Sequence, residues 1–153
     1  MSLEAQFVAV SQLLLAALLG GIIGLDRERK QRDAGLRTHI LVGIGACLFT
    51  VLSMLAFPGG DPGRVASQIL PGIGFLGAGT VLKYGRNIHG LTTAASVWIT
   101  AAVGMAVGAG AWFLAICGTL LIWFVLAILR RFEDDKLRRD AAQHGDDQPE
   151  HHT

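Results

Sequence analysis

RVASQILPGIGFLGAGTVLKYGRNIHGLTTAASVW (Arg64–Trp98) is the most informative part of this sequence. Glycine and other small residues are concentrated there in two blocks, Gly72–Gly79 and Gly90–Ser96, within apolar surroundings. In a water-soluble helix each glycine costs about 1 kcal/mol relative to alanine, so this much glycine would indicate a loop. In lipid, small residues let helix backbones approach closely. The stretch therefore predicts two close-packed membrane helices joined by the short basic loop Lys83–His89.

Outward from this stretch the chain stays apolar, with 52% hydrophobic and 16% charged residues among its 153. None of its twelve acidic residues falls inside an apolar run, whereas a soluble domain would distribute them along helix faces. About 20 residues are needed to cross roughly 30 Å of hydrocarbon. We therefore expect an all-α membrane domain over residues 1–132, with five transmembrane helices at about 5–25, 38–57, 65–82, 91–110 and 111–129. Residues 133–153 are expected to form a short charged tail that is disordered at its end.

The basic residues predict the orientation of these helices. With the amino terminus outside, the inner segments are 26–37, 83–90 and 130–153, and they hold twelve of the thirteen Lys and Arg residues. Arg64 alone lies outside. This positive-inside bias predicts an outside amino terminus and a cytoplasmic carboxyl terminus. Because no basic residue precedes the first apolar run, that run is expected to be an uncleaved anchor and not a signal peptide.

The glycine block Gly72–Gly77 has the letters of a dinucleotide-binding fingerprint, but it lacks the strand before it and the acidic residue about 20 positions later. Tight helix packing is the favoured interpretation. The alternative is a third helix broken at Pro71-Gly72, with freed backbone groups lining a substrate site, as in transporters. Two G-x-x-x-G pairs, Gly20–Gly24 and Gly104–Gly108, indicate further helix contacts, within one chain or between chains.

Charged residues gather only at the inner ends of the helices. A charge near hydrocarbon is costly unless it is paired, so Asp26 or Glu28 is expected to pair with Arg37 and orient the first two helices. A solvated charge run facing lipid headgroups is an equally open alternative, and His39 and His89 are interpreted as solvated. The candidate functional residues at this inner rim are Asp26, Arg27, Glu28, Arg37, Thr38, Lys83, Arg86 and His89.

Four blocks, GLDRER (Gly24–Arg29), AGLRTHILV (Ala34–Val42), QILPGIGFLGAG (Gln68–Gly79) and HGLTTAASVW (His89–Trp98), resemble the signature blocks of the MgtC/SapB family in order and spacing. The resemblance implies a bacterial inner-membrane protein linked to magnesium limitation, acid survival and persistence in hosts. It also implies a regulator whose partner is an F-type ATP synthase. The positions that match the family blocks are Asp26, Arg27, Glu28, Gly35, Arg37, Thr38, Gly72, Gly74, Gly77, Gly79, Gly90, Thr93, Ala94 and Trp98.

Two features depart from the family pattern. Asp26 replaces the usual glutamate of the first block, and the chain ends about twenty residues after the last span, without the ACT-like domain of many members. The glycine-rich positions from Gly72 to Trp98 are interpreted as a helix-packing motif. No nucleophile–base pair, metal-ligand spacing or phosphate loop stands in a suitable context, so we expect no catalysis, no cofactor, no bound metal and no nucleic-acid partner.

The sequence therefore predicts a regulatory protein of the inner membrane. Its expected partners are the lipid bilayer, another membrane protein and further copies of this chain. The alternative is a small ion or solute transporter built around a broken third helix.

Overall fold

The computed structural model describes residues 2–56, 61–84 and 87–145. This part of the chain forms five helices and one short hairpin. In order they are α1 (Leu3–Arg29), α2 (Leu36–Leu55), α3 (Pro62–Ala78), β1 (Leu82–Tyr84), β2 (Asn87–His89), α4 (Leu91–Gly108) and α5 (Trp112–Gly145). By length and composition, α1, α2 and α4 are apolar enough to cross a membrane, and Trp112–Ile128 of α5 is a shorter apolar segment.

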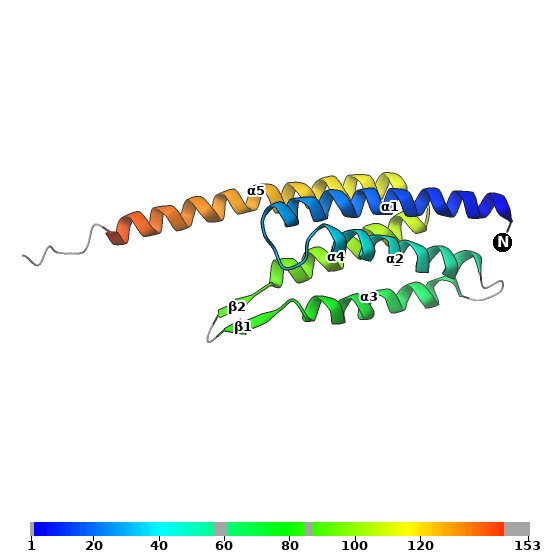
Figure 1. The fold of residues 1–153 in the computed structure, drawn as a ribbon, viewed down its shortest axis with the longest axis horizontal. Helices are drawn as coiled ribbons and strands as arrows, with labels where there is room; N and C mark the ends of the chain where they lie inside the picture. The colour runs from blue at the N-terminus through cyan, green and yellow to red at the C-terminus, as the bar shows by residue number, and fades with distance from the viewer. Residues whose placement is uncertain (1, 57–60, 85–86, 146–153) are drawn as a thin grey trace, which may run out of the picture.

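The helices run alternately up and down in one bundle (Figure 1). α2 and α4 lie between α1 and α5 on one side and α3 on the other. One buried cluster joins α1, α2, α4 and α5 around Ile23, Cys47 and Val107. A second joins α2, α3 and α4 around Ala46, Ile69 and Ala101. The core therefore follows the two central helices along their length.

Glycine allows α1 and α4 to approach α2 at backbone distance. A Cβ atom added to Gly24 would lie 2.8 Å from the Leu36 Cα atom, and one added to Gly108 would lie 2.7 Å from the Cys47 carbonyl oxygen. Gly20 and Gly104 are equally close to α2. Since lipid tails are as apolar as leucine, this close van der Waals contact is a main source of helix association. Both G-x-x-x-G pairs are thus contacts within the chain.

Two details differ from the sequence-based expectations. The segment expected as a basic loop contains an antiparallel hairpin in which Leu82 pairs with His89 and Tyr84 with Asn87. The fifth helix does not stop at residue 129, because α5 continues through the charged segment to Gly145. The rest of the expected tail, residues 146–153, lies outside the described residues.

The third helix is not broken at Pro71-Gly72, because α3 is one continuous helix with Pro71 inside it. Asp61 caps its first turn by accepting a hydrogen bond from the Gly63 N–H at 2.8 Å, and Pro62 follows at a position that needs no donor. The premise of the transporter alternative, a row of backbone groups freed by a broken helix, is therefore wrong.

Candidate functional site

Four polar side chains are buried together where α1 ends and where α2 and α4 begin. Arg27 of α1 is 4% exposed and contacts Thr93 of α4. His39 of α2 is fully buried and contacts Ser96 of α4. We call Arg27, His39, Thr93 and Ser96 the buried polar cluster. The helices are close together here, because Gly24 lets His39 approach α1.

Hydrogen bonds run through this cluster from one helix to the next. The Arg27 guanidinium donates to the Thr93 hydroxyl at 2.8 Å, and His39 Nε2 lies 3.1 Å from the Ser96 hydroxyl. The other ring nitrogen, Nδ1, lies 2.8 Å from the Gly35 carbonyl oxygen at the start of α2. The cluster thereby connects α1, α2 and α4 through polar groups that are shielded from water and lipid.

The cluster has two alternative hydrogen-bond arrangements. A carbonyl oxygen only accepts, so His39 Nδ1 donates to Gly35, and in a neutral ring Nε2 must then accept. The Ser96 hydroxyl, which has one proton, faces two acceptors: Nε2 and, at 2.8 Å, the Thr93 carbonyl oxygen. Rotation of this hydroxyl switches the bond from one acceptor to the other. The Ser96 hydroxyl can therefore either link α4 to α2 or bond within α4.

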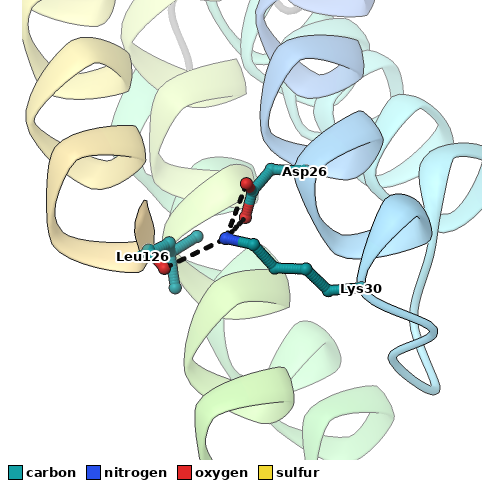
Figure 2. Close-up of polar contacts among 3 residues, drawn as sticks. All are labelled: Asp26, Lys30 and Leu126. Atoms are coloured by element: carbon teal, nitrogen blue, oxygen red, sulfur yellow. Dashed lines mark hydrogen bonds and ion pairs between the residues drawn. The ribbon is translucent and has the colours of Figure 1, made fainter. Parts of the chain in front are cut away.

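A second polar contact joins α1 to α5 (Figure 2). The Lys30 ammonium lies 2.7 Å from the Asp26 carboxylate and donates to the Leu126 carbonyl oxygen of α5 at 3.2 Å. The two side chains are only 22% and 13% exposed. An acid four residues before a base on a helix is a favourable arrangement, and Asp26 here neutralises the cation that holds α5.

The expected pairing of Arg37 with Asp26 or Glu28 is wrong for the described residues. Asp26 pairs with Lys30, and a Glu28 carboxylate oxygen accepts a hydrogen bond from the Leu36 N–H at 2.6 Å. This carboxylate satisfies one free donor at the start of α2, where a helix favours negative charge. α1 ends at Arg29, and Gly35 is the residue that precedes α2. Arg37 itself is exposed.

Of the remaining inner-rim residues, those that the structure describes do not join the buried polar cluster. Thr38 and His89 are exposed, whereas Arg86 and the side chain of Lys83 lie outside the described part of the chain. The interpretation of His39 as a solvated residue is wrong, because its turn of α2 faces α1 and α4 and not the membrane surface.

The glycine-rich motif has several roles in the structure. Gly77 contacts Ala94 of α4, with the nearest atom 3.5 Å from an added Cβ, so this helix contact agrees with the packing interpretation. An added Cβ at Gly72 or Gly74 would meet no atom of another helix within 4 Å in the described part of the chain, so neither glycine makes a close helix contact there. Gly79 ends α3, Gly90 starts α4 in the left-handed conformation, and Trp98 is 43% exposed on α4.

Sequence reasoning missed His39 and Ser96 as members of the site. A usable signal was present in α4, where Thr93, Ser96 and Thr100 recur at intervals of three and four residues and so occupy one helix face. In a membrane helix such a polar face points toward other helices and not toward lipid. Within the described ranges, no group of three or more His, Cys, Asp and Glu side chains could hold a metal ion.

Comparison with known proteins gives a consistent result. The family model described as the MgtC family matches residues 13–135. Over 132 residues the chain is 48% identical to "Protein MgtC" of Brucella abortus, covering 84% of this chain and 56% of that protein. It is 45% identical over 124 residues to "Protein MgtC" of Salmonella typhimurium, covering 81% of this chain and 53% of that protein.

A third relative is the Escherichia coli K12 protein named "Putative magnesium transporter YhiD", which is 42% identical over 137 residues, covering 84% of this chain and 63% of that protein. The chain thus spans between about half and two thirds of the length of these relatives. No solved structure matches it.

Proposed function

Because the chain belongs to the MgtC family, we propose that it is a five-span protein of the bacterial inner membrane that regulates a membrane partner and does not transport magnesium. The function concerns adaptation to low magnesium, acid or host stress, and the partner implied by the family resemblance is an F-type ATP synthase. The proposal covers the segment described here, which is shorter than the relatives it matches.

The five-span topology is supported by the direction of the helices. The segment between α1 and α2, the hairpin and the charged continuation of α5 all lie at one end of the bundle (Figure 1). The amino terminus and the connection from α4 to α5 lie at the opposite end. Twelve of the thirteen basic residues fall within residues 26–37, 83–90 and 130–153, which include these three segments and the helix ends beside them, and basic residues favour the cytoplasmic side.

One observation carries the choice of regulator over transporter: the buried polar cluster contains a guanidinium, an imidazole and two hydroxyls, and no carboxylate. Magnesium prefers octahedral oxygen ligands that usually include carboxylates. A guanidinium only donates hydrogen bonds, so Arg27 does not supply a ligand for a divalent cation at the point where α1, α2 and α4 meet. Of the two acids next to Arg27 along α1, Asp26 is paired with Lys30 and Glu28 accepts a hydrogen bond from the Leu36 N–H.

Burial of the Arg27 guanidinium beside a hydroxyl group costs free energy, so its position suggests a function. Ionisable residues inside membrane bundles are rare and mark functional sites. Since the cluster joins three helices through rotatable hydroxyls, it suits a device that responds to the relative position of these helices. A membrane regulator requires such a response if binding of its partner displaces one of these helices.

The test combines a flux measurement with two matched variants. We expect the purified protein in liposomes to carry no magnesium flux above that of empty liposomes. We expect Arg27→Met to abolish the cellular effect while the protein still accumulates in the membrane, because methionine keeps an unbranched apolar side chain in the helix but removes the guanidinium and its charge. Arg29→Met, at an exposed position two residues later, should keep the effect.

Saturable magnesium uptake by the reconstituted protein would overturn the regulatory proposal in favour of transport. Full cellular activity of Arg27→Met would remove the buried polar cluster from the mechanism. Cross-linked purification from native membranes identifies the partner. Recovery of F-type ATP synthase subunits with the native chain, and their reduced recovery with Arg27→Met, would support the partner named above.

A further inference from the structure

A groove of about 440 Å³ lies between α2 and α3, and its lining side chains are apolar except that of Gln68. Glycine hollows both of its walls. An added Cβ at Gly45 of α2 or at Gly72 of α3 would meet no atom of another helix within 4 Å in the described part of the chain. Atoms that line an open gap lose van der Waals contacts that the chain itself does not replace. The groove therefore has room for an occupant from outside the chain.

The dimensions of the groove match one leaflet of a bilayer. Its lining residues on α3 run from Val65 to Leu76, about 17 Å along the helix, and those on α2 run from Leu41 to Phe49. The hydrocarbon of one leaflet is about 15 Å thick. α2 ends and α3 begins at the same end of the bundle, which the proposed topology places outside (Figure 1). The groove therefore starts at the outer surface and crosses the outer leaflet.

Two opposite charges lie at the outer end of this groove. Asp61 caps α3 and accepts a hydrogen bond from the Gly63 N–H at 2.8 Å with one carboxylate oxygen, and Arg64 follows in the first turn. Both side chains are exposed, and within the part of the chain that the structure describes neither forms an ion pair. One turn below Arg64, the exposed Gln68 amide adds donors and an acceptor inside the groove.

We propose that this groove binds one acyl chain of phosphatidylethanolamine from the outer leaflet, with Arg64 on the lipid phosphate and Asp61 on its ammonium. The proposal rests on the five-span topology proposed above, but not on the regulatory role. Residues four apart lie on one face of a helix, and on α3 such a series holds a cation, an amide and two apolar positions. Its members are Arg64, Gln68, Gly72 and Leu76, all exposed. Phosphate, ester carbonyl and acyl chain follow each other in the same order in a phospholipid.

Charge and size favour this occupant over the alternatives. The outer end of the groove carries one base and one acid, which complement a headgroup with one phosphate and one ammonium. An anionic lipid such as phosphatidylglycerol has no ammonium for Asp61 and would bring its negative charge close to that carboxylate. Spread over its length, the groove volume corresponds to a cross-section of about 25 Å², whereas a helix about 10 Å across covers about 80 Å². A single hydrocarbon chain therefore fits the groove better than a helix does.

The first experiment measures lipid binding to the purified full chain by native mass spectrometry. Phosphatidylethanolamine should bind with a dissociation constant about threefold to fivefold lower than that of phosphatidylglycerol, because each exposed charge contributes modestly. Asp61→Asn removes the charge but keeps a capping side chain, and it should abolish this preference.

A matched pair of variants tests whether the lipid lies in the groove. Gly72→Leu fills the groove and should weaken the binding of phosphatidylethanolamine. Gly118→Leu in α5, where an added Cβ also meets nothing within 4 Å, should leave the binding unchanged. Equal affinity of the unmodified chain for the two lipids, or unchanged binding to Gly72→Leu, would overturn the proposal.

A second experiment locates the acyl chain in a bilayer that contains both lipids. Phe49→Trp places a fluorophore in the groove, and Leu120→Trp places one on the exposed side of α5, after phenylalanine has replaced Trp98, Trp112 and Trp123. Phosphatidylethanolamine with brominated acyl chains should quench Phe49→Trp more strongly than brominated phosphatidylglycerol does, whereas both should quench Leu120→Trp equally.

Two results of this experiment would contradict the proposal. Equal quenching of Phe49→Trp by the two lipids would mean that unselected lipid fills the groove, and weak quenching by both would mean that a protein covers it. Neither experiment depends on magnesium flux or on a cellular effect, so failure here is distinguishable from failure of the proposed function.

Discussion

Gly108→Ala is the sharpest test of the packing between the two central helices. The added Cβ would lie 2.7 Å from the Cys47 carbonyl oxygen and 2.9 Å from the Thr50 Cβ atom. Ordinary contact begins at 3.4 Å, so α4 and α2 would have to separate locally by about 0.7 Å. Neither neighbour can turn away, because one is backbone and Thr50 is held by a hydrogen bond from its hydroxyl to the Ala46 carbonyl oxygen.

The expected cost follows from the loss of contact. A gap of 0.5–1 Å forfeits about a quarter to a half of the van der Waals attraction between the surfaces it separates. Overpacking of a well-packed core typically costs about 1–3 kcal/mol. Gly118→Ala, with nothing within 4 Å of its added Cβ, should be neutral or slightly stabilising because alanine favours helix. Because the gain in helix propensity applies to both variants, we expect them to differ in free energy of unfolding by the overpacking cost, about 1–3 kcal/mol.

The assay is reversible unfolding in mixed micelles by added sodium dodecyl sulfate, followed by helical circular dichroism. Both variants keep the charge and nearly the same hydrophobicity, so a difference reports packing alone. If Gly108→Ala unfolds at the same detergent fraction as Gly118→Ala, the contact between α2 and α4 is looser than the structure has it. The reasoning from small residues to close helix approach would then fail at its central example.

Three further predictions address the connections between helices. Lys30→Met should destabilise the protein by about 1–3 kcal/mol in the same unfolding assay, because the ion pair with Asp26 and the hydrogen bond to the Leu126 carbonyl are lost together. A stability like that of the unmodified chain would show that α5 is held by apolar contacts alone. Gly90→Ala should lower the free energy of unfolding more than Gly110→Ala does. Both glycines have positive φ (86° and 79°), but only at Gly90 would the added Cβ meet the Thr80 carbonyl. Equal losses of stability would contradict the close contact between Gly90 and Thr80. With Cys47 and Cys117 replaced by alanine, Ala109→Cys should react with a membrane-impermeant thiol reagent from outside and Gln31→Cys only from inside; the opposite pattern would invert the topology.

The orientation of the helices and the family could be inferred from the sequence alone. Both depend on local information: twelve of thirteen basic residues in alternate segments, and four blocks of residues such as GLDRER and HGLTTAASVW in a fixed order. The G-x-x-x-G pairs also indicated helix contacts correctly, because absence of a side chain is a property of the residue itself. The family is confirmed by the match over residues 13–135, and the orientation stays a prediction.

Tertiary structure decided which polar residues meet. Arg27, His39 and Ser96 are separated by 12 and 57 positions along the chain, so no local pattern shows that they share one buried cluster. Arg37 was expected to pair with an acid, but α2 turns His39 toward α1 and leaves Arg37 exposed. Likewise, Gly72 and Gly108 look alike in sequence, yet of the two only Gly108 is so close to another helix that an added Cβ would meet its atoms. The rotation of each helix about its own axis determines these contacts, and that rotation is set by how all five helices pack together.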